Sequence, residues 1–216
     1  MKNLWIVILL NVVIGYAYLP RLVFDQEFSL GNPIKIKKPE VAQAFYGELR
    51  NRTDYYKIIA GEDFDLYVNI LAPDILAGRT DFSVEVFGTG KAITLNGELY
   101  EWEKYREKST DDSYWKGPAY EESLEKGEYL IQVYNLDNQG KYVLVVGEKE
   151  TFSPKELINF ILSMPKLKGY FEKAPMTAYF NQIGLFLFIT LFIIGVLIAF
   201  IVFLIRRLTA PKFRPL

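Results

Sequence analysis

"GEYLIQVYNLDNQGKYVLVVGE", residues 127–148, is the stretch that indicates the fold. Tyr129, Ile131 and Val133 occupy every second position in its first half. Apolar residues at this period are typical of a strand with one face in a core. A second apolar run, KYVLVVGE, follows the turn formers LDNQG. We therefore predict two strands joined as a hairpin.

The same pattern extends back through the chain. FDLYVNIL, residues 64–71, alternates in the same way, and AFYGEL, YYKIIA, FSVEVF and KAITL are short and rich in aromatic and β-branched residues. Asn96 and Gly97 lie between AITL and ELYEW, and this dipeptide is the strongest short signal for a hairpin. These features predict a mainly β fold, an antiparallel and jelly-roll-like β-sandwich, over residues 24–150.

The clearest single feature lies near the C-terminus. Residues 183–205 read IGLFLFITLFIIGVLIAFIVFLI and carry no charge. About 20 apolar residues suffice to cross a bilayer as a helix, so we predict one transmembrane helix here. Arg206 and Arg207 follow at once. The short basic tail, residues 206–216, is expected on the cytoplasmic side, where positive residues concentrate.

The N-terminus has the features of a secretory signal peptide. Lys2 precedes the apolar run LWIVILLNVVIG, and the small residues Gly15 and Ala17 precede a break. We predict a signal peptide over residues 1–17 with cleavage after Ala17; the alternative is an uncleaved anchor. Either version places the residues between the two apolar segments, about 20 to 180, outside the cytoplasm. With cleavage, we predict a single-pass protein of the cell membrane with its N-terminal domain outside and its C-terminus in the cytoplasm.

Residues 151–182 predict a short amphipathic helix and a linker before the membrane. Ser153, Pro154 and Glu156 form a capping box with proline at the first helical position, and Pro165 is expected to end the helix. Its apolar stripe is expected to pack under the sandwich, and the alternative is that it lies in the membrane interface. The stripe contains Leu157, Ile158, Ile161, Leu162 and Met164. Aromatic residues suited to the outer membrane surface follow at Tyr170, Phe171, Tyr179 and Phe180.

The composition excludes several kinds of catalytic group. The 216 residues include no cysteine and no histidine, and the formal net charge is −1. The chain therefore lacks thiol nucleophiles, disulfides and the usual general base near neutral pH. A near-neutral charge gives no electrostatic case for nucleic acid as a partner. We predict a protein that is not an enzyme and that needs no cofactor.

An aromatic and acidic segment, residues 98–128, is the candidate ligand site. Aromatic rings beside carboxylates can bind a sugar, because the rings cover its apolar faces and the acids accept hydrogen bonds from its hydroxyls. The candidate residues are Trp102, Tyr105, Tyr114, Trp115 and Tyr120. The alternative is that these rings belong to the core of the sandwich, as large aromatics usually do.

Acidic residues offer two further hypotheses. Asp63 and Asp65 could hold calcium at a turn, because this ion prefers oxygen ligands. A carboxylate pair for glycoside hydrolysis, a remote alternative, could come from Glu101, Glu103, Asp111 and Asp112.

Two local motifs complete the candidates. Asn51 begins the sequon Asn-Arg-Thr in an expected turn, which permits glycosylation in a host with the machinery. Gly195 and Ala199 are four residues apart in the apolar run, and small residues at this spacing let two membrane helices pack closely.

The hairpin region, residues 124–148, resembles the pre-peptidase C-terminal (PPC) domains, a bacterial and archaeal type of β-sandwich. In that family a G-x-Y pattern opens one strand, as Gly127 and Tyr129 do here. A G-x-Y-x-L pattern opens the next, here at Gly140, Tyr142 and Leu144. The resemblance implies a non-catalytic module; some members bind calcium or carbohydrate, but the family's usual calcium acids have no counterpart here.

Together these features predict a membrane-anchored, outward-facing β-sandwich. We expect it to act through protein–protein interaction or as an accessory subunit of a cell-surface assembly, with the lipid bilayer and a protein as partners through the sandwich and the membrane helix. The alternative is a module that binds a carbohydrate or another small ligand.

Overall fold

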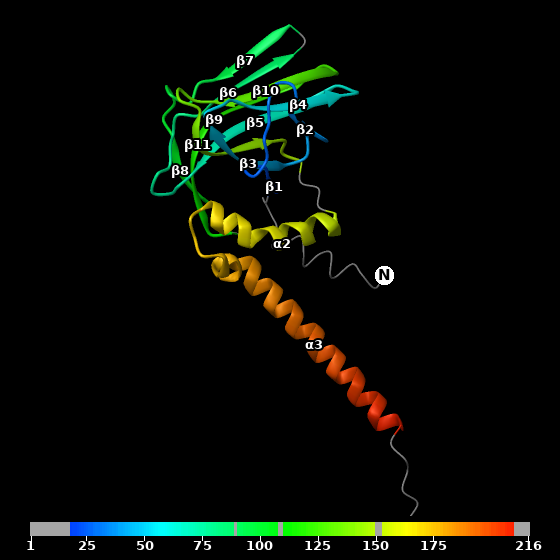
Figure 1. Cartoon of the computed structure of the whole chain (residues 1–216). Coiled ribbons are helices and arrows are strands. Elements are labelled where there is room, and N and C mark those ends of the chain that lie inside the picture. Colours follow the sequence, from blue (N-terminus) through cyan, green and yellow to red (C-terminus); the bar gives the residue numbers. More distant parts are fainter. Residues whose placement is uncertain (1–17, 89, 108–109, 150–152, 210–216) are drawn as a thin grey trace, which may run out of the picture.

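The computed structural model describes residues 18–88, 90–107, 110–149 and 153–209. Two β-sheets pack face to face, one helix lies beneath them, and a long second helix extends away from the sandwich (Figure 1). The mainly β fold and the sandwich are confirmed. The predicted signal peptide with its cleavage position, and the last residues of the basic tail, lie outside the described residues.

The first sheet has six strands in the order β1-β3-β11-β5-β9-β8. Their bounds are Leu19–Leu22 for β1, Gln43–Arg50 for β3, Gln139–Val146 for β11, Phe64–Pro73 for β5, Asp112–Leu124 for β9 and Glu103–Glu107 for β8. All neighbours are antiparallel except β1 and β3, which are parallel. The sandwich thus includes β1, which lies before the predicted boundary at residue 24.

The second sheet has five strands in the order β2-β4-β10-β6-β7. Their bounds are Ile34–Ile36 for β2, Asp54–Ala60 for β4, Gly127–Tyr134 for β10, Ser83–Gly88 for β6 and Lys91–Leu95 for β7. Here β2 runs parallel to β4, and the other neighbours are antiparallel. Each sheet therefore has one parallel edge pair, and all its other pairs are antiparallel, as expected for the predicted antiparallel sandwich.

Strands β10 and β11 form as predicted but do not pair with each other. β10 pairs with β4 and β6 in the five-stranded sheet, whereas β11 pairs with β3 and β5 in the six-stranded sheet. The turn between them crosses from one sheet to the other, so the predicted hairpin is wrong. Asn135 shapes the turn, because its side chain donates to Gln139 O and accepts from Gln139 N.

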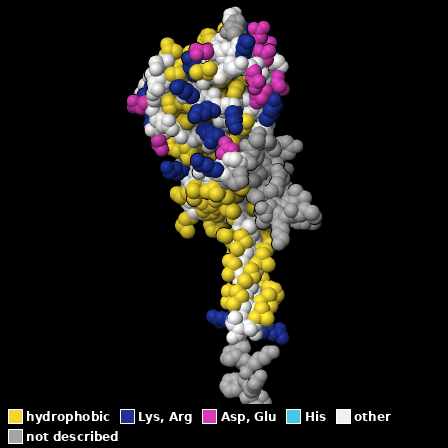
Figure 2. All heavy atoms as spheres, turned by 90° about the vertical axis from the view of Figure 1, so that its right-hand side faces the viewer, with side chains coloured by type: hydrophobic (Ala, Val, Ile, Leu, Met, Phe, Trp, Pro, Cys, Tyr) yellow, Lys and Arg dark blue, Asp and Glu magenta, His cyan; other side chains and the backbone are white. Residues whose placement is uncertain are grey.

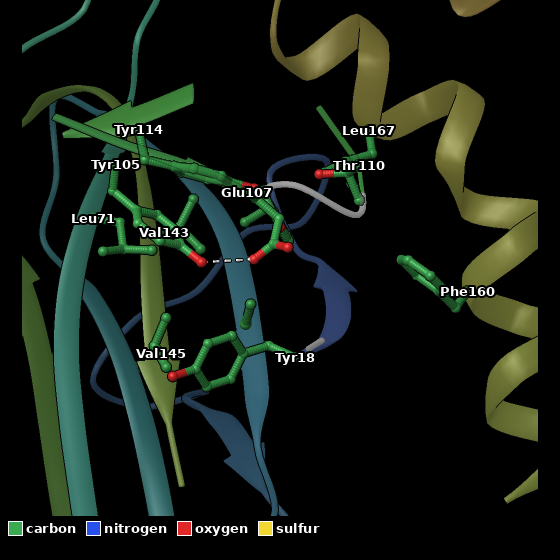
Figure 3. Close-up of a pocket in the computed structure, with 12 residues that line it drawn as sticks. Tyr18, Leu71, Tyr105, Glu107, Thr110, Tyr114, Val143, Val145, Phe160 and Leu167 are labelled. Atoms are coloured by element: carbon green, nitrogen blue, oxygen red, sulfur yellow. Dashed lines mark hydrogen bonds between the residues drawn. The ribbon is translucent and has the colours of Figure 1, made fainter. Parts of the chain in front are cut away.

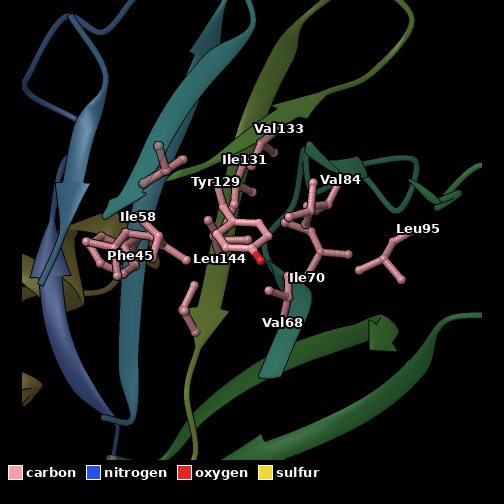
Figure 4. Close-up of a cluster of buried hydrophobic side chains, with 14 of the residues drawn as sticks. Phe45, Ile58, Val68, Ile70, Val84, Leu95, Tyr129, Ile131, Val133 and Leu144 are labelled. Atoms are coloured by element: carbon pink, nitrogen blue, oxygen red, sulfur yellow. The ribbon is translucent and has the colours of Figure 1, made fainter. Parts of the chain in front are cut away.

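The core lies between the sheets. The side chains of β10 that alternate inward, Tyr129, Ile131 and Val133, meet Ile70 and Leu144 from the opposite sheet (Figure 4). Two rings need glycine on a neighbouring strand. A Cβ at Gly88 would overlap the Tyr129 ring, and one at Gly47 would overlap the Tyr142 ring.

The predicted hairpin at Asn96 and Gly97 is also wrong. β7 ends at Leu95, and no strand of the described residues pairs with it after this turn. Instead, the Asn96 side chain accepts hydrogen bonds from the backbone N–H groups of Glu98 and Leu99. Asparagine makes such local bonds readily, and they turn the chain without returning it along the same strand.

Helix α2, Pro154–Tyr170, begins with the predicted capping box at Ser153. It continues through Pro165, so the predicted end there is wrong. A proline lacks the N–H that would bond to the carbonyl four residues earlier, here Ile161. The Tyr179 hydroxyl donates to that oxygen at 3.2 Å and replaces part of the missing hydrogen bonding.

The 3-10 helix η1, Pro175–Tyr179, leads into α3, Gln182–Thr209. Among the described residues, α3 is the one helix long and apolar enough to cross a membrane. It extends the predicted span, residues 183–205, at both ends. Figure 1 shows it leaving the base of the sandwich below α2.

Candidate functional site

The predicted ligand residues do not share one surface. Tyr114 and Trp115 are neighbours on β9, so they point to opposite faces of the six-stranded sheet. Tyr114 is 4% exposed and lies in the cluster between the six-stranded sheet and α2. Trp115 is half-buried and packs against the core between the sheets, while Lys104 Nζ lies 4.8 Å from its ring centroid. The alternative interpretation, that these rings fill cores, fits Tyr114 and much of Trp115.

Trp102 closes one end of the sandwich. Its Nε1 donates to Gly97 O at 2.8 Å, and its ring lies against Gly117, where a Cβ would come within 2.7 Å. The ring is half-buried against the central core. Gly97 was expected in a hairpin turn, but its carbonyl oxygen instead accepts the hydrogen bond from Trp102.

Tyr105 and Tyr120 again lie on opposite faces. Tyr105 faces outward beside Tyr114, and its hydroxyl donates to Glu107 Oε2 at 2.9 Å. Burial, with the nearby Glu107 charge, raises the pKa of Tyr105 to about 12. Tyr120 packs against the central core, and its hydroxyl bonds to Glu122 and to Lys91 Nζ. The prediction grouped these rings into one site because they are close together in the chain, but the strands turn them to opposite faces of the sheet.

A small cavity does exist between the six-stranded sheet and α2 (Figure 3). Tyr18, Tyr105 and Tyr114 border it, with Phe160 and Leu167 on the helix side. Its volume is about 40 Å³. One water needs about 10–15 Å³, so the cavity could hold a few waters and is too small for a sugar ring.

The most unusual chemistry lies beside this cavity. Lys168 of α2 and Asp112 at the start of β9 form an ion pair of 2.7 Å, and their side chains are 3% and 0% exposed. Lys168 Nζ also donates to Thr110 O at 2.6 Å. Lys173 adds a second cation, 2.7 Å from the same Asp112 oxygen. Asp112 Oδ2 has no hydrogen-bond partner among the described residues.

This cluster, Lys168, Asp112 and Lys173, is here called the α2 clamp. It joins the segment before α3 to the sandwich. Charged groups so deeply buried are costly unless they are paired, so they hold the two parts in one arrangement. Tyr170 reinforces it: its hydroxyl lies 2.7 Å from Gly47 O and 2.6 Å from Tyr142 O.

Tyr170 and Phe171, predicted at the outer membrane surface, are instead 4% and 3% exposed beneath the sandwich. That prediction is wrong for these two rings. The Tyr170 hydroxyl donates to Gly47 O, and the Phe171 ring packs against Tyr46. These contacts with the six-stranded sheet account for the difference. Tyr179 and Phe180 remain 42% and 80% exposed.

A second buried carboxylate lies in the core. Asp54 is 2% exposed and accepts a hydrogen bond of 2.7 Å from the Tyr142 hydroxyl, which is also 2.7 Å from the Tyr56 hydroxyl. Burial raises the pKa of Asp54 to about 6, although the hydrogen bond from Tyr142 opposes the shift. This group changes charge just below neutral pH.

Two of the acids considered for glycoside hydrolysis have structural partners, and the other two are exposed. Asp112 belongs to the α2 clamp, and Asp111 pairs with Arg106 Nη2 at 2.5 Å. Glu101 and Glu103 are exposed, Glu103 on the edge strand β8. The described residues thus show no pair of these carboxylates facing a substrate-sized pocket.

Asp63 and Asp65 each accept a hydrogen bond from the end of β9 or the turn after it. Asp63 Oδ1 accepts from Lys126 N at 2.8 Å, and Asp65 Oδ1 accepts from Ser123 Oγ at 2.7 Å. The described residues contain no group of three or more acids arranged to hold a metal. These bonds assign both aspartates to joining β5 and β9, and the calcium hypothesis gains no support from them.

The remaining candidates lie where the sequence predicts. Asn51 is exposed in the turn between β3 and β4 with a φ of 58°. Gly195 and Ala199 are exposed on α3, and the space beside Gly195 is open. Glycosylation and helix packing stay predictions.

The α2 clamp was missed at the sequence level, although one signal was present. Lys168 lies four residues after Met164, and both residues are buried on the same side of α2. A lysine within an apolar stripe needs a counter-charge. Its partner Asp112 is 56 residues away in the chain, so the pairing could not be found without the fold.

The fold and these contacts define a β-sandwich module joined to an apolar helix that could span a membrane. No protein-family model matches the chain, and no curated protein matches it. Among solved structures, the chain is similar to the pre-peptidase C-terminal domain of a collagenase from Bacillus anthracis. The two are 12% identical, with a TM-score of 0.35, over 56% of this chain and 96% of that domain. The pre-peptidase C-terminal domain is also the type of sandwich that residues 124–148 resemble in sequence.

Proposed function

We propose that the protein is a single-pass membrane protein whose β-sandwich lies outside the cytoplasm and acts as a non-catalytic module that contacts another protein. The observation that supports this most is the α2 clamp. It couples the sandwich to the segment that leads into α3. A module on a flexible tether needs no such coupling, whereas an assembly subunit benefits from a fixed position above the bilayer.

The outer face of the five-stranded sheet offers the partner surface. α2 lies under the other sheet and leaves this face uncovered (Figure 1). Tyr55, Ile59, Phe87, Leu130 and Tyr134 point outward from three adjacent strands and are half-buried or exposed. Aromatic residues among polar ones are typical of interfaces between separately folded proteins.

A protease-protection experiment tests the topology. Protease added outside intact cells should digest the sandwich and leave a small fragment that contains α3. Complete protection of the sandwich, with digestion only after lysis, would contradict the proposal.

Photo-crosslinking tests the partner surface. A photoreactive amino acid at Leu130 or Tyr55 should give one adduct of the same size with a protein in native membranes. The same group at Asp137, in the turn between β10 and β11, serves as a control and should give none. Failure to form any adduct from the sheet face would remove the support for a protein partner there.

A further inference from the structure

Helix α2 presents three distinct sides. One side, with Leu167, Tyr170 and Phe171, packs under the six-stranded sheet. A second side, with Phe160 and Met164, packs against η1 and the start of α3. The third side carries Ile158 and Leu162, which are four residues apart and therefore lie on one face.

That third side is apolar yet uncovered. Ile158 is 57% exposed and Leu162 is 69% exposed. Met176 and Phe180, beside the start of α3, are 79% and 80% exposed. These four residues, here called the basal patch, belong to α2 and to the segment that leads into α3. Figure 2 shows hydrophobic side chains at the base of the sandwich next to those of α3. Large exposed apolar patches usually mark a surface that binds something.

The packing of α2 against α3 determines the depth of α2 relative to the membrane surface. Ile183 and Leu187 of α3 join the cluster with Leu157, Phe160 and Met164 of α2. They are four residues apart, which is about 6 Å along a helix. If the apolar run of α3 enters the bilayer at Ile183, α2 lies level with its first two turns. An interfacial helix buries its apolar face to a similar depth, about 5–10 Å.

Positive charge lies next to the basal patch. Lys155 and Lys166 are exposed on α2. By helical geometry they follow Ile158 and Leu162 around the helix. Beyond them, Glu156, Asn159 and Ser163 border a groove whose basic residues are Arg21, Lys35, Lys37 and Lys38. Figure 2 shows Lys and Arg side chains gathered on this side of the sandwich, above the apolar base.

We infer that α2 is an interfacial membrane helix: the basal patch inserts into the surface of an anionic phospholipid bilayer, and the adjacent lysines and the groove face its headgroups. The inference rests on the proposed function, because it requires α3 to span that bilayer. An apolar stripe with lysines beside it on the helix surface is typical of helices that lie in the interface. The continuity with α3 favours lipid over a protein as the occupant. With α2 clamped to the sandwich, this second contact fixes the tilt of the sandwich.

The absence of native cysteine makes a fluorescence test direct. Ile158→Cys, labelled with an environment-sensitive dye, is prepared in the full chain and reconstituted into vesicles of phosphatidylcholine and phosphatidylglycerol. The matched control is Ile59→Cys, because Ile59 is 60% exposed, close to the 57% of Ile158, but lies on the outer face of the five-stranded sheet. A probe at Val196→Cys reports whether α3 is inserted.

The probe at position 158 should be several-fold less accessible to aqueous iodide than the probe at 59, and a spin-labelled phospholipid should quench it. Equal iodide access at 158 and 59, with the probe at 196 inside lipid, would overturn the inference and leave the proposed function intact. A probe at 196 exposed to water would instead overturn the proposed membrane anchoring.

Two further measurements separate lipid from other occupants. Dilution of the protein in the vesicles should not expose the probe at 158; exposure on dilution would mean that a second copy covers the patch and would refute the inference. The double variant Lys155→Gln and Lys166→Gln should reduce the shielding at 158 in vesicles with phosphatidylglycerol. No difference between that variant and the unaltered lysines would refute the role of anionic headgroups.

Discussion

Replacing Asp112 by alanine should release α2 from the sandwich. The substitution leaves Lys168, which is 3% exposed, and Lys173 without their shared carboxylate. Breaking a buried ion pair from one side costs about 3–5 kcal/mol, because the remaining charge is buried and uncompensated. Lys168→Met should cost less, because Asp112 then keeps Lys173 at 2.7 Å. The double variant Asp112→Leu and Lys168→Met should recover most of the loss.

Hydrogen exchange of the α2 amides, measured on the full chain in detergent micelles, separates local from global effects. At 1.4 kcal/mol per tenfold, the loss predicted for Asp112→Ala corresponds to about a hundredfold or more in α2 protection. The amides of β10 and β11 should change much less if the sandwich itself stays folded.

An exposed ion pair provides the control. Lys104 and Asp74 are 3.2 Å apart with side chains 63% and 30% exposed, so Asp74→Ala should change stability by less than about 1 kcal/mol. The reasoning is refuted if the α2 amides are as well protected in Asp112→Ala as in Asp74→Ala. It is also refuted if Lys168→Met lowers the protection of α2 more than Asp112→Ala does.

Three further predictions concern the sandwich. Trp115→Ala should lower stability by up to about 3 kcal/mol in thermal unfolding, because its ring packs on the core; an unchanged Tm would contradict a structural role. The pKa of Asp54, raised to about 6 in the folded chain, means that the native state binds the proton more tightly than the unfolded chain does. Relative to Asp54→Asn, the wild type should therefore lose up to about 3 kcal/mol as pH rises from about 4 to 6, and parallel Tm curves over that window would refute this. Gly88→Ala should destabilise by about 1–3 kcal/mol in urea unfolding, because its Cβ would overlap the Tyr129 ring, and the same substitution at the open Gly61 should have little effect.

Strands β3 to β7, β10 and β11 could be predicted because each has its own run of apolar, aromatic and β-branched residues. Strands β1, β2, β8 and β9 were not predicted, and β8 shows why, since none of its residues is buried. Tyr129, Ile131 and Val133 point inward at every second position, and this alternation is visible in the sequence. The pairing of β10 and β11 could not be predicted in the same way. Two apolar strands joined by a short turn look identical whether they pair with each other or cross between sheets.

The separation of the candidate ligand residues follows from strand geometry alone. Adjacent residues in a strand face opposite sides, so Tyr114 and Trp115 could never have lined one surface within β9. By contrast, the bond between Lys168 and Asp112 depends on how α2 docks under the sheet. No local pattern contains that information.

The central placement of β10 and β11 has a consequence for how the chain acquires its structure. Each sheet is completed only when one of these strands inserts between partners made much earlier: β10 between β4 and β6, and β11 between β3 and β5. β11 ends at Val146, shortly before α2 and α3. Contacts so distant in sequence slow folding, because loop closure precedes any gain from pairing. During synthesis, the earlier strands therefore keep unpaired edges until almost the entire sandwich has been synthesised. A chain that stops before residue 127 should form neither complete sheet.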